Sequence, residues 1–188
     1  MARFLQSRAS KENSVDIFDS NRLTVACVRS LIPGNFHLME LQRRENTALQ
    51  NITPCFLLLH EKSIFVLQQC HQNGIIHGDA ADEQWMCYNY LGDGTPFENP
   101  VRKNGKNISI LASVLKLSED QFHNCVLFDN ECELRRIPVN AEYHSVIWAD
   151  QLESHFASLL PKLPVRYSHT QLEALHDIFV LVSAEVQS

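Results

Sequence analysis

The fold is decided by residues 55–70, whose sequence is CFLLLHEKSIFVLQQC. Two apolar runs, Cys55 to His60 and Ser63 to Cys70, are joined at His60-Glu61-Lys62. Continuous apolar runs of this length are typical of strands that are covered on both faces of a sheet. Because the joint is so short, the two strands are expected to form an antiparallel hairpin.

Outward from this hairpin, helix and strand patterns alternate. Further strands are expected at Phe36 to Leu41, Trp85 to Leu91, Cys125 to Phe128 and Ser145 to Trp148. Helices are expected from Asn21 to Leu31, from Pro100 with Asn99 as its cap, from Asp150 with Glu153 to Leu160, and from Ser168 with Gln171 to about Val186. These elements predict an α/β fold with a central mixed β-sheet and flanking helices.

The chain is expected to divide into three parts. Residues 1–20 are polar, lack a clear period and are interpreted as a flexible N-terminal arm. Residues 21–150 form the α/β domain. Residues 151–188 form C-terminal helices that pack on this domain or on a partner.

Composition limits the class of protein. A length of 188 residues, 45% hydrophobic and 20% charged, fits a globular chain with a real core. The most apolar run carries His60, Glu61 and Lys62, so no membrane span is expected, and no secretory signal pattern is found. Six dispersed cysteines without a CxxC pair indicate a reducing cytoplasm.

The cysteines and histidines invite two chemical interpretations, and both are disfavoured. Cys55, His60, Cys70 and His71 have ligand types that suit zinc, but Cys70 and His71 point to opposite faces of a strand. A Cys–His nucleophile at Cys70 or Cys87 has no local motif to support it. We therefore expect no metal and no cofactor.

Between Ser63 and Leu115 a set of motifs occurs in a fixed order. The set consists of Ser63-Ile-Phe-Val-Leu67, Gly74-Ile-Ile-His-Gly78-Asp79, Trp85 and Asn99-Pro100-Val-Arg102-Lys103-Asn104. This order resembles the central signature of the nuclease-related (NERD) domain family. In that family a strand ending in Glu-x-Lys is followed by a Gly-x-x-x-Gly-Asp loop, a tryptophan and a helix that opens with Asn-Pro.

The resemblance implies a restriction-endonuclease-like, PD-(D/E)xK core. In such nucleases carboxylates at the end of a hairpin hold Mg²⁺, and a nearby lysine positions or activates the attacking water. Here Gln68 stands in place of the glutamate and Cys70 in place of the lysine, while Cys55, or Phe56 in the other register, replaces the aspartate. Arg22 replaces the acidic residue of the first helix. A neutral amide and thiols do not make a carboxylate cage.

The leading hypothesis is therefore a catalytically inactive NERD-like domain that acts as a structural or protein-interaction subunit. The family resemblance places it in a nucleic-acid-processing or defence assembly. A second hypothesis is an active Mg²⁺-dependent nuclease whose ligands have migrated to Glu40, Asp79, Asp82 or Glu83. A third is an unrelated α/β binding protein. Asp79 is more simply interpreted as a brace of its loop.

Two surfaces are candidates for contacts. Three basic residues lie where one helix begins, namely Arg102, Lys103 and Lys106, and Arg135 and Arg136 follow downstream. These residues are suited to weak contacts with DNA phosphates. The alternative, which is slightly favoured, is a helix face that is simply exposed to solvent. The last helix carries an apolar stripe of Leu172, Leu175, Phe179 and Val182. This stripe is expected to pack on its own domain, with oligomerisation or a protein partner as the alternative.

Overall fold

The computed structural model describes residues 25–45, 47–135, 137 and 143–183. The expected N-terminal arm, the start of the first helix at Asn21, and Arg22 and Arg136 all lie outside these residues. Within them, the α/β class with a mixed sheet and flanking helices is confirmed.

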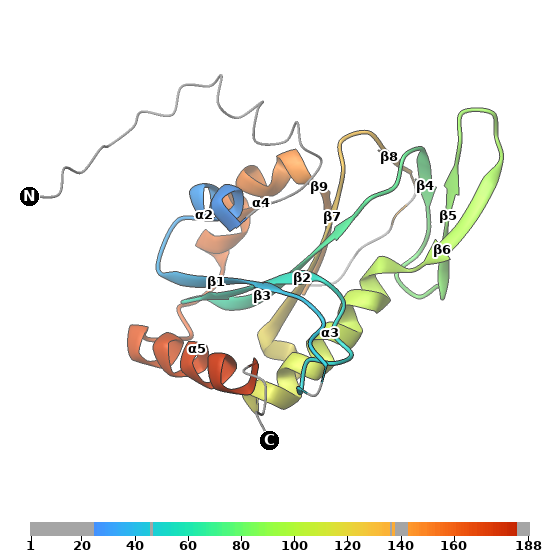
Figure 1. The fold of residues 1–188 in the computed structure, drawn as a ribbon. Helices are drawn as coiled ribbons and strands as arrows, with labels where there is room; N and C mark the ends of the chain where they lie inside the picture. The colour runs from blue at the N-terminus through green and yellow to red at the C-terminus, as the bar shows by residue number, and fades with distance from the viewer. Residues whose placement is uncertain (1–24, 46, 136, 138–142, 184–188) are drawn as a thin grey trace, which may run out of the picture.

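The central sheet has five strands in the order β1-β2-β3-β7-β9 (Figure 1). Its strands are β1 (Phe36–Leu41), β2 (Cys55–His60), β3 (Ser63–Cys70), β7 (Phe122–Phe128) and β9 (His144–Trp148). The β2–β3 pair is the expected antiparallel hairpin, in which His60 is opposite Ser63. β7 pairs parallel to β3, and β9 pairs parallel to β7.

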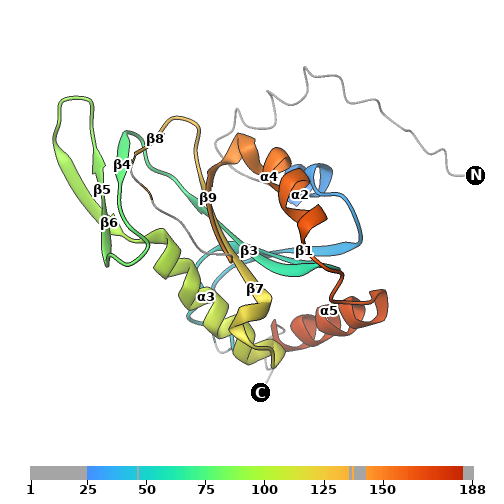
Figure 2. The ribbon, with the colours of Figure 1, turned by 180° about the vertical axis from the view of Figure 1, so that it is seen from behind.

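Helices cover both faces of this sheet, as Figures 1 and 2 show from opposite sides. They are α2 (Val25–Leu31), α3 (Pro100–Leu115), α4 (Leu152–Leu159) and α5 (His169–Ser183). Leu57 and Leu59 pack among residues of α3 and α5, whereas Phe56 and Leu58 pack with residues of α2 and α4. Alternate residues of one strand therefore enter two separate cores, which explains its unbroken apolar sequence.

A second, smaller sheet has the strand order β6-β5-β4-β8 and was not expected. It consists of β4 (Ile75–His77), β5 (Gln84–Tyr88), β6 (Gly94–Glu98) and β8 (Glu133–Leu134). The strand predicted to reach Leu91 ends at Tyr88, because Asn89 begins a turn in which its side chain accepts hydrogen bonds from the backbone of Leu91 and Asp93.

The two predicted capping boxes have different outcomes. Ser168 and Gln171 exchange reciprocal hydrogen bonds, with Gln171 Oε1 2.8 Å from the Ser168 amide, and α5 begins there as expected. The box of Asp150 and Glu153 was wrong, because Ala149–Gln151 forms a 3₁₀ turn and α4 begins without a side-chain cap. No helix in the described part of the chain is long and apolar enough to cross a membrane.

Candidate functional site

A cleft of about 380 Å³ opens at one end of the hairpin. β2 begins at Cys55 and β3 ends at Cys70, so this end gathers the positions that the sequence singled out. The neighbouring β1 contributes Glu40, which is opposite Phe56, and α3 contributes Lys103. The cleft is lined by Glu40, Thr53, Pro54, Cys55, Phe56, Gln68, Gln69, His71 and Lys103.

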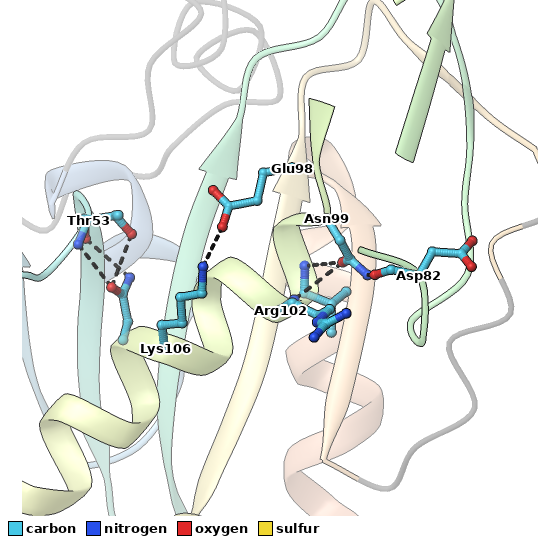
Figure 3. A network of polar contacts seen from close by, with 8 residues as sticks. Thr53, Asp82, Glu98, Asn99, Arg102 and Lys106 are labelled. Carbon is cyan, nitrogen blue, oxygen red and sulfur yellow. Dashed lines mark hydrogen bonds and ion pairs between the residues drawn. The ribbon is translucent and has the colours of Figure 1, made fainter. Parts of the chain in front are cut away.

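Asn99 fixes the start of the helix that closes this cleft (Figure 3). Its side-chain oxygen accepts hydrogen bonds from the amides of Val101 and Arg102 at 2.9 and 3.3 Å. Its side-chain nitrogen donates to the backbone oxygens of Asp79, Ala80 and Asp82, the last at 2.7 Å. One fully buried side chain thus caps α3 and ties it to the Gly78-Asp79 loop.

The same loop is held by Trp85. The Trp85 indole nitrogen donates to the Asp79 backbone oxygen at 2.8 Å, and the ring stacks on Phe128. A Cβ at Gly78 would lie 2.2 Å from the Trp85 ring, so this position admits only glycine. The Gly-Asp, Trp and Asn-Pro motifs therefore form one structural support for α3.

Two further asparagines lock α3 to the sheet. Asn104 Nδ2 donates to the Val66 backbone oxygen and to Asn124 Oδ1, both at 2.8 Å. Asn107 Oδ1 accepts from the amide and hydroxyl of Thr53, just before β2, at 2.9 and 3.0 Å. This ladder of amides holds the wall that carries Lys103 against the hairpin.

The hairpin positions carry neutral groups. Burial raises the thiol pKa of Cys55 to about 12, although a hydrogen bond with Asn107 acts in the opposite direction. Burial also raises the pKa of Cys70 to about 12, although the charge of Lys103 opposes the shift. Both thiols are therefore protonated at neutral pH. Gln68 is buried, and its Oε1 accepts no hydrogen bond within the described chain.

These donors do not fit the Mg²⁺ that the family implies. Mg²⁺ requires hard oxygen ligands in octahedral geometry, and a protonated thiol is neither hard nor anionic. The buried carboxylate next to the cleft, Asp129, accepts hydrogen bonds from His71 Nδ1 at 2.7 Å and from Gln69 Nε2 at 3.2 Å. Both of its oxygens therefore already accept hydrogen bonds, one from Gln69 on β3 and one from His71 just after β3.

The acids of the migrated-ligand hypothesis are dispersed. Asp79 Oδ1 accepts from the Ala81 amide and Asp82 Oδ2 from the Asp79 amide, so both brace their own loop. Glu83 lines a second cleft, and Glu40 alone of the four lines the cleft at the hairpin. Across the described residues, no three His, Cys, Asp or Glu side chains converge at this end of the sheet.

The structure also does not bring together the set of Cys55, His60, Cys70 and His71 that was considered for zinc. His60 Nε2 lies 2.9 Å from the Pro33 backbone oxygen, and its Nδ1 accepts from the Lys62 amide. His71 is held by Asp129. The described cysteine and histidine side chains of that set do not form a group within metal-binding reach.

The three basic residues of α3 are divided between two places. Lys103 enters the cleft at the hairpin, whereas Arg102 and Lys106 line a second cleft of about 260 Å³ with Glu83, Gln84 and Glu98. Figure 3 shows Lys106 directed at Glu98, and their charged atoms are 2.7 Å apart. Arg135 is paired with Glu133 at 2.6 Å. Phosphate binding by Arg102, Lys103 and Lys106 stays a prediction.

The stripe of α5 lies largely inside the molecule. Leu172, Leu175 and Phe179 are buried in the core formed with β2 and α3, and Val182 is half-buried. The opposite side of α5 exposes Ile178, Val180 and Leu181. A role of this helix in association stays a prediction.

One family model matches part of the chain. Residues 40–129 match the model of the nuclease-related domain, from the end of β1 to the residue after β7. The matched segment contains the whole cleft and its Asn99 support. No curated protein and no solved structure matches the chain.

Proposed function

From the premise that residues 40–129 are a nuclease-related domain, we propose that this domain is catalytically inactive. It acts as a structural, protein-interaction subunit that also contacts nucleic acid weakly, within a nucleic-acid-processing or defence assembly in the cytoplasm. The assembly is suggested by the family alone. The inactivity is supported by the neutral groups at the cleft.

One observation carries the proposal: the hairpin end offers protonated thiols and an amide where the family has carboxylates and a lysine. Cys55 and Cys70 have pKa values of about 12, so neither supplies an anionic ligand or a base at neutral pH. A metal-dependent nuclease needs a cation to neutralise charge that builds on the phosphate. Lys103 brings a positive charge to the cleft, which suits binding of a phosphate rather than its hydrolysis.

The test is incubation of the purified chain with single- and double-stranded DNA and RNA in Mg²⁺ or Mn²⁺. We expect no cleavage above the background of the buffer. The experiment must include a mock purification, because a contaminating nuclease gives the same product.

A second candidate, the active nuclease with migrated ligands, is favoured by the presence of both Glu40 and Lys103 in the cleft. It predicts cleavage that Glu40→Gln or Asp79→Asn abolishes. Glu119→Gln, a change at an exposed acid in the turn before β7, is the matched control. Cleavage lost in Glu40→Gln and retained in Glu119→Gln would overturn the proposal.

A further inference from the structure

We infer that His37, Glu173 and His176 form a zinc-binding site that fastens α5 to β1. Their ligand atoms all lie within 4.8 Å of one another. Among the described residues, no other group of three His, Cys, Asp or Glu side chains has this arrangement. The site lies near the turn of the hairpin, whereas the cleft lies at its open end, because His37 is opposite Leu59 and Glu40 is opposite Phe56. It is independent of the proposed function.

The helix sets the spacing of its ligands. Glu173 and His176 are three residues apart on α5, so their side chains emerge on the same face. His169, four residues before Glu173, is on this face too, and its Nε2 lies 3.6 Å from Glu173 Oε1. β1 supplies His37 from across the interface.

The distances suit a tetrahedral zinc ion. Ligands about 2.0–2.1 Å from zinc at tetrahedral angles are about 3.3–3.4 Å apart. His37 Nε2 and Glu173 Oε1 are 3.3 Å apart, so this pair already has the separation that a shared ion requires. The ring centroids of His37 and His176 are 4.6 Å apart and the ring planes are inclined at 25°. Both imidazoles therefore stand within reach of one ion, which they would bind by turning one nitrogen of each ring toward it.

The ligand types select zinc over harder cations. Two imidazoles and a carboxylate are a common set of protein ligands for zinc, with a fourth position open. Mg²⁺ and Ca²⁺ prefer sets made of oxygen atoms. The exposed side chain of His169 or a water molecule can fill the fourth position.

An ion pair between Glu173 and a protonated histidine is the simpler interpretation of the same contacts. It accounts for His37 and His169 beside Glu173, and it gives His176 a separate partner in Asp177, whose Oδ1 lies 3.7 Å from His176 Nδ1. It gives no reason for the rings of His37 and His176 to stack on each other. Zinc binding uses all three side chains at once and joins the C-terminal helix to the sheet.

The test is calorimetric titration of the chain, stripped of metal and held under a reducing agent without thiol groups, with zinc sulfate alone. We expect one site per chain and a rise in melting temperature, because an ion that binds only the folded state stabilises it. His37→Ala and His176→Gln should each weaken binding by more than about tenfold, since changes even outside the ligand set commonly weaken metal sites by that factor. Both variants should also lose the zinc-dependent rise.

His77→Ala is the matched control, because it removes a histidine from the small sheet and leaves β1 and α5 intact. Cobalt substitution separates this site from the cysteines, since thiolate ligands give a charge-transfer band that imidazole and carboxylate ligands lack. Absence of zinc binding, equal affinity in the three variants, or a thiolate band would each overturn the inference. Circular dichroism of the variants without metal shows whether a loss of affinity reflects unfolding.

Discussion

His123 occupies a buried position between two strands of the central sheet. It is 3% exposed, and its Nε2 lies 2.9 Å from the Ser145 hydroxyl oxygen on β9. Burial lowers its pKa from the usual 6.5 of histidine to about 4, and the positive charges that His155 and His144 acquire act in the same direction. The folded protein therefore keeps this imidazole neutral at a pH where the unfolded chain protonates it.

This shift predicts acid sensitivity. Between pH 6.5 and about 4 the unfolded chain binds more protons than the folded one, so stability present above pH 6.5 is lost as the pH falls. For His123 alone the loss by pH 5 is about 2 kcal/mol, at about 1.4 kcal/mol per pKa unit. Urea unfolding at pH 7 and pH 5 measures it.

The variant His123→Gln should flatten this dependence, because glutamine has no proton to gain. His77→Gln removes a histidine from the small sheet and should retain the wild-type dependence. If both variants lose stability equally between the two pH values, the sensitivity belongs to other groups, such as His60 or His155, whose pKa values burial also lowers.

Residues of the candidate site differ in how well the sequence revealed them. Cys55, Gln68 and Cys70 were singled out by the resemblance to the nuclease-related domain, which left Cys55 and Phe56 as alternatives, and the observed hairpin brings the two strand ends together. The pair of His71 and Asp129 was missed, because it depends on the parallel register that places Cys70 opposite Phe128. No pattern in the sequence indicates that β3 pairs with β7, because several strands and α3 lie between them in the chain.

At the scale of elements, long apolar patterns in the sequence predicted helices and strands correctly, and short or weak patterns did not. The hairpin strands and α3 were predicted because each has a long apolar signal and clear limits, such as Asn99-Pro100. In the small sheet only β5 was predicted, whereas β4, β6 and β8 were missed because they are short and largely exposed and so carry little apolar periodicity. The Asp150 box failed because the chain tightens into a 3₁₀ turn before α4.

The packing of α5 gives a prediction for this helix. Leu175 is 8% exposed and Leu181 is 75% exposed. Leu175→Ala should destabilise the protein by about 2–5 kcal/mol, because it leaves a cavity in the core with β2 and α3. Leu181→Ala, the matched control, should change the free energy of unfolding by less than about 0.5 kcal/mol. Urea denaturation compares them.

A truncation of the chain separates packing of α5 from association. Truncation after Pro164 removes all of α5 and should leave a protein that is insoluble or much less stable, since Leu172, Leu175 and Phe179 each contribute about 1.5–3 kcal/mol. If the truncated chain folds normally and only loses assembly in size-exclusion chromatography, α5 serves a partner instead. If neither folding nor association changes, the role assigned to this helix is wrong.

The whole molecule carries a net charge of −6, so any binding of nucleic acid must rest on a local group of basic residues. We expect weak DNA binding without base preference, through Arg102, Lys103 and Lys106. Lys103→Ala should reduce the slope of log affinity against log salt by about 0.9, the share of one phosphate contact. Fluorescence anisotropy over a salt series measures the slope.

Two variants sharpen this measurement. Glu98→Gln removes the carboxylate 2.7 Å from Lys106 and should strengthen binding if that lysine reaches phosphate. Lys162→Ala, in the 3₁₀ turn after α4, removes one positive charge elsewhere and should leave the slope unchanged. An equal slope in the Lys103 and Lys162 variants would show that Lys103 makes no contact with phosphate.

The support built by Gly78, Trp85 and Asn99 has a consequence for what a match to the nuclease-related domain can report. These residues hold α3 in place through packing and backbone contacts, and they are distinct from positions 55, 68 and 70, where the resemblance puts the catalytic groups. The residues that support the architecture are therefore different from those at the end of the hairpin. A chain can keep the Gly-Asp, Trp and Asn-Pro motifs while Cys55, Gln68 and Cys70 offer only neutral groups, so a match to this domain reports the scaffold, and activity depends on the groups at the hairpin.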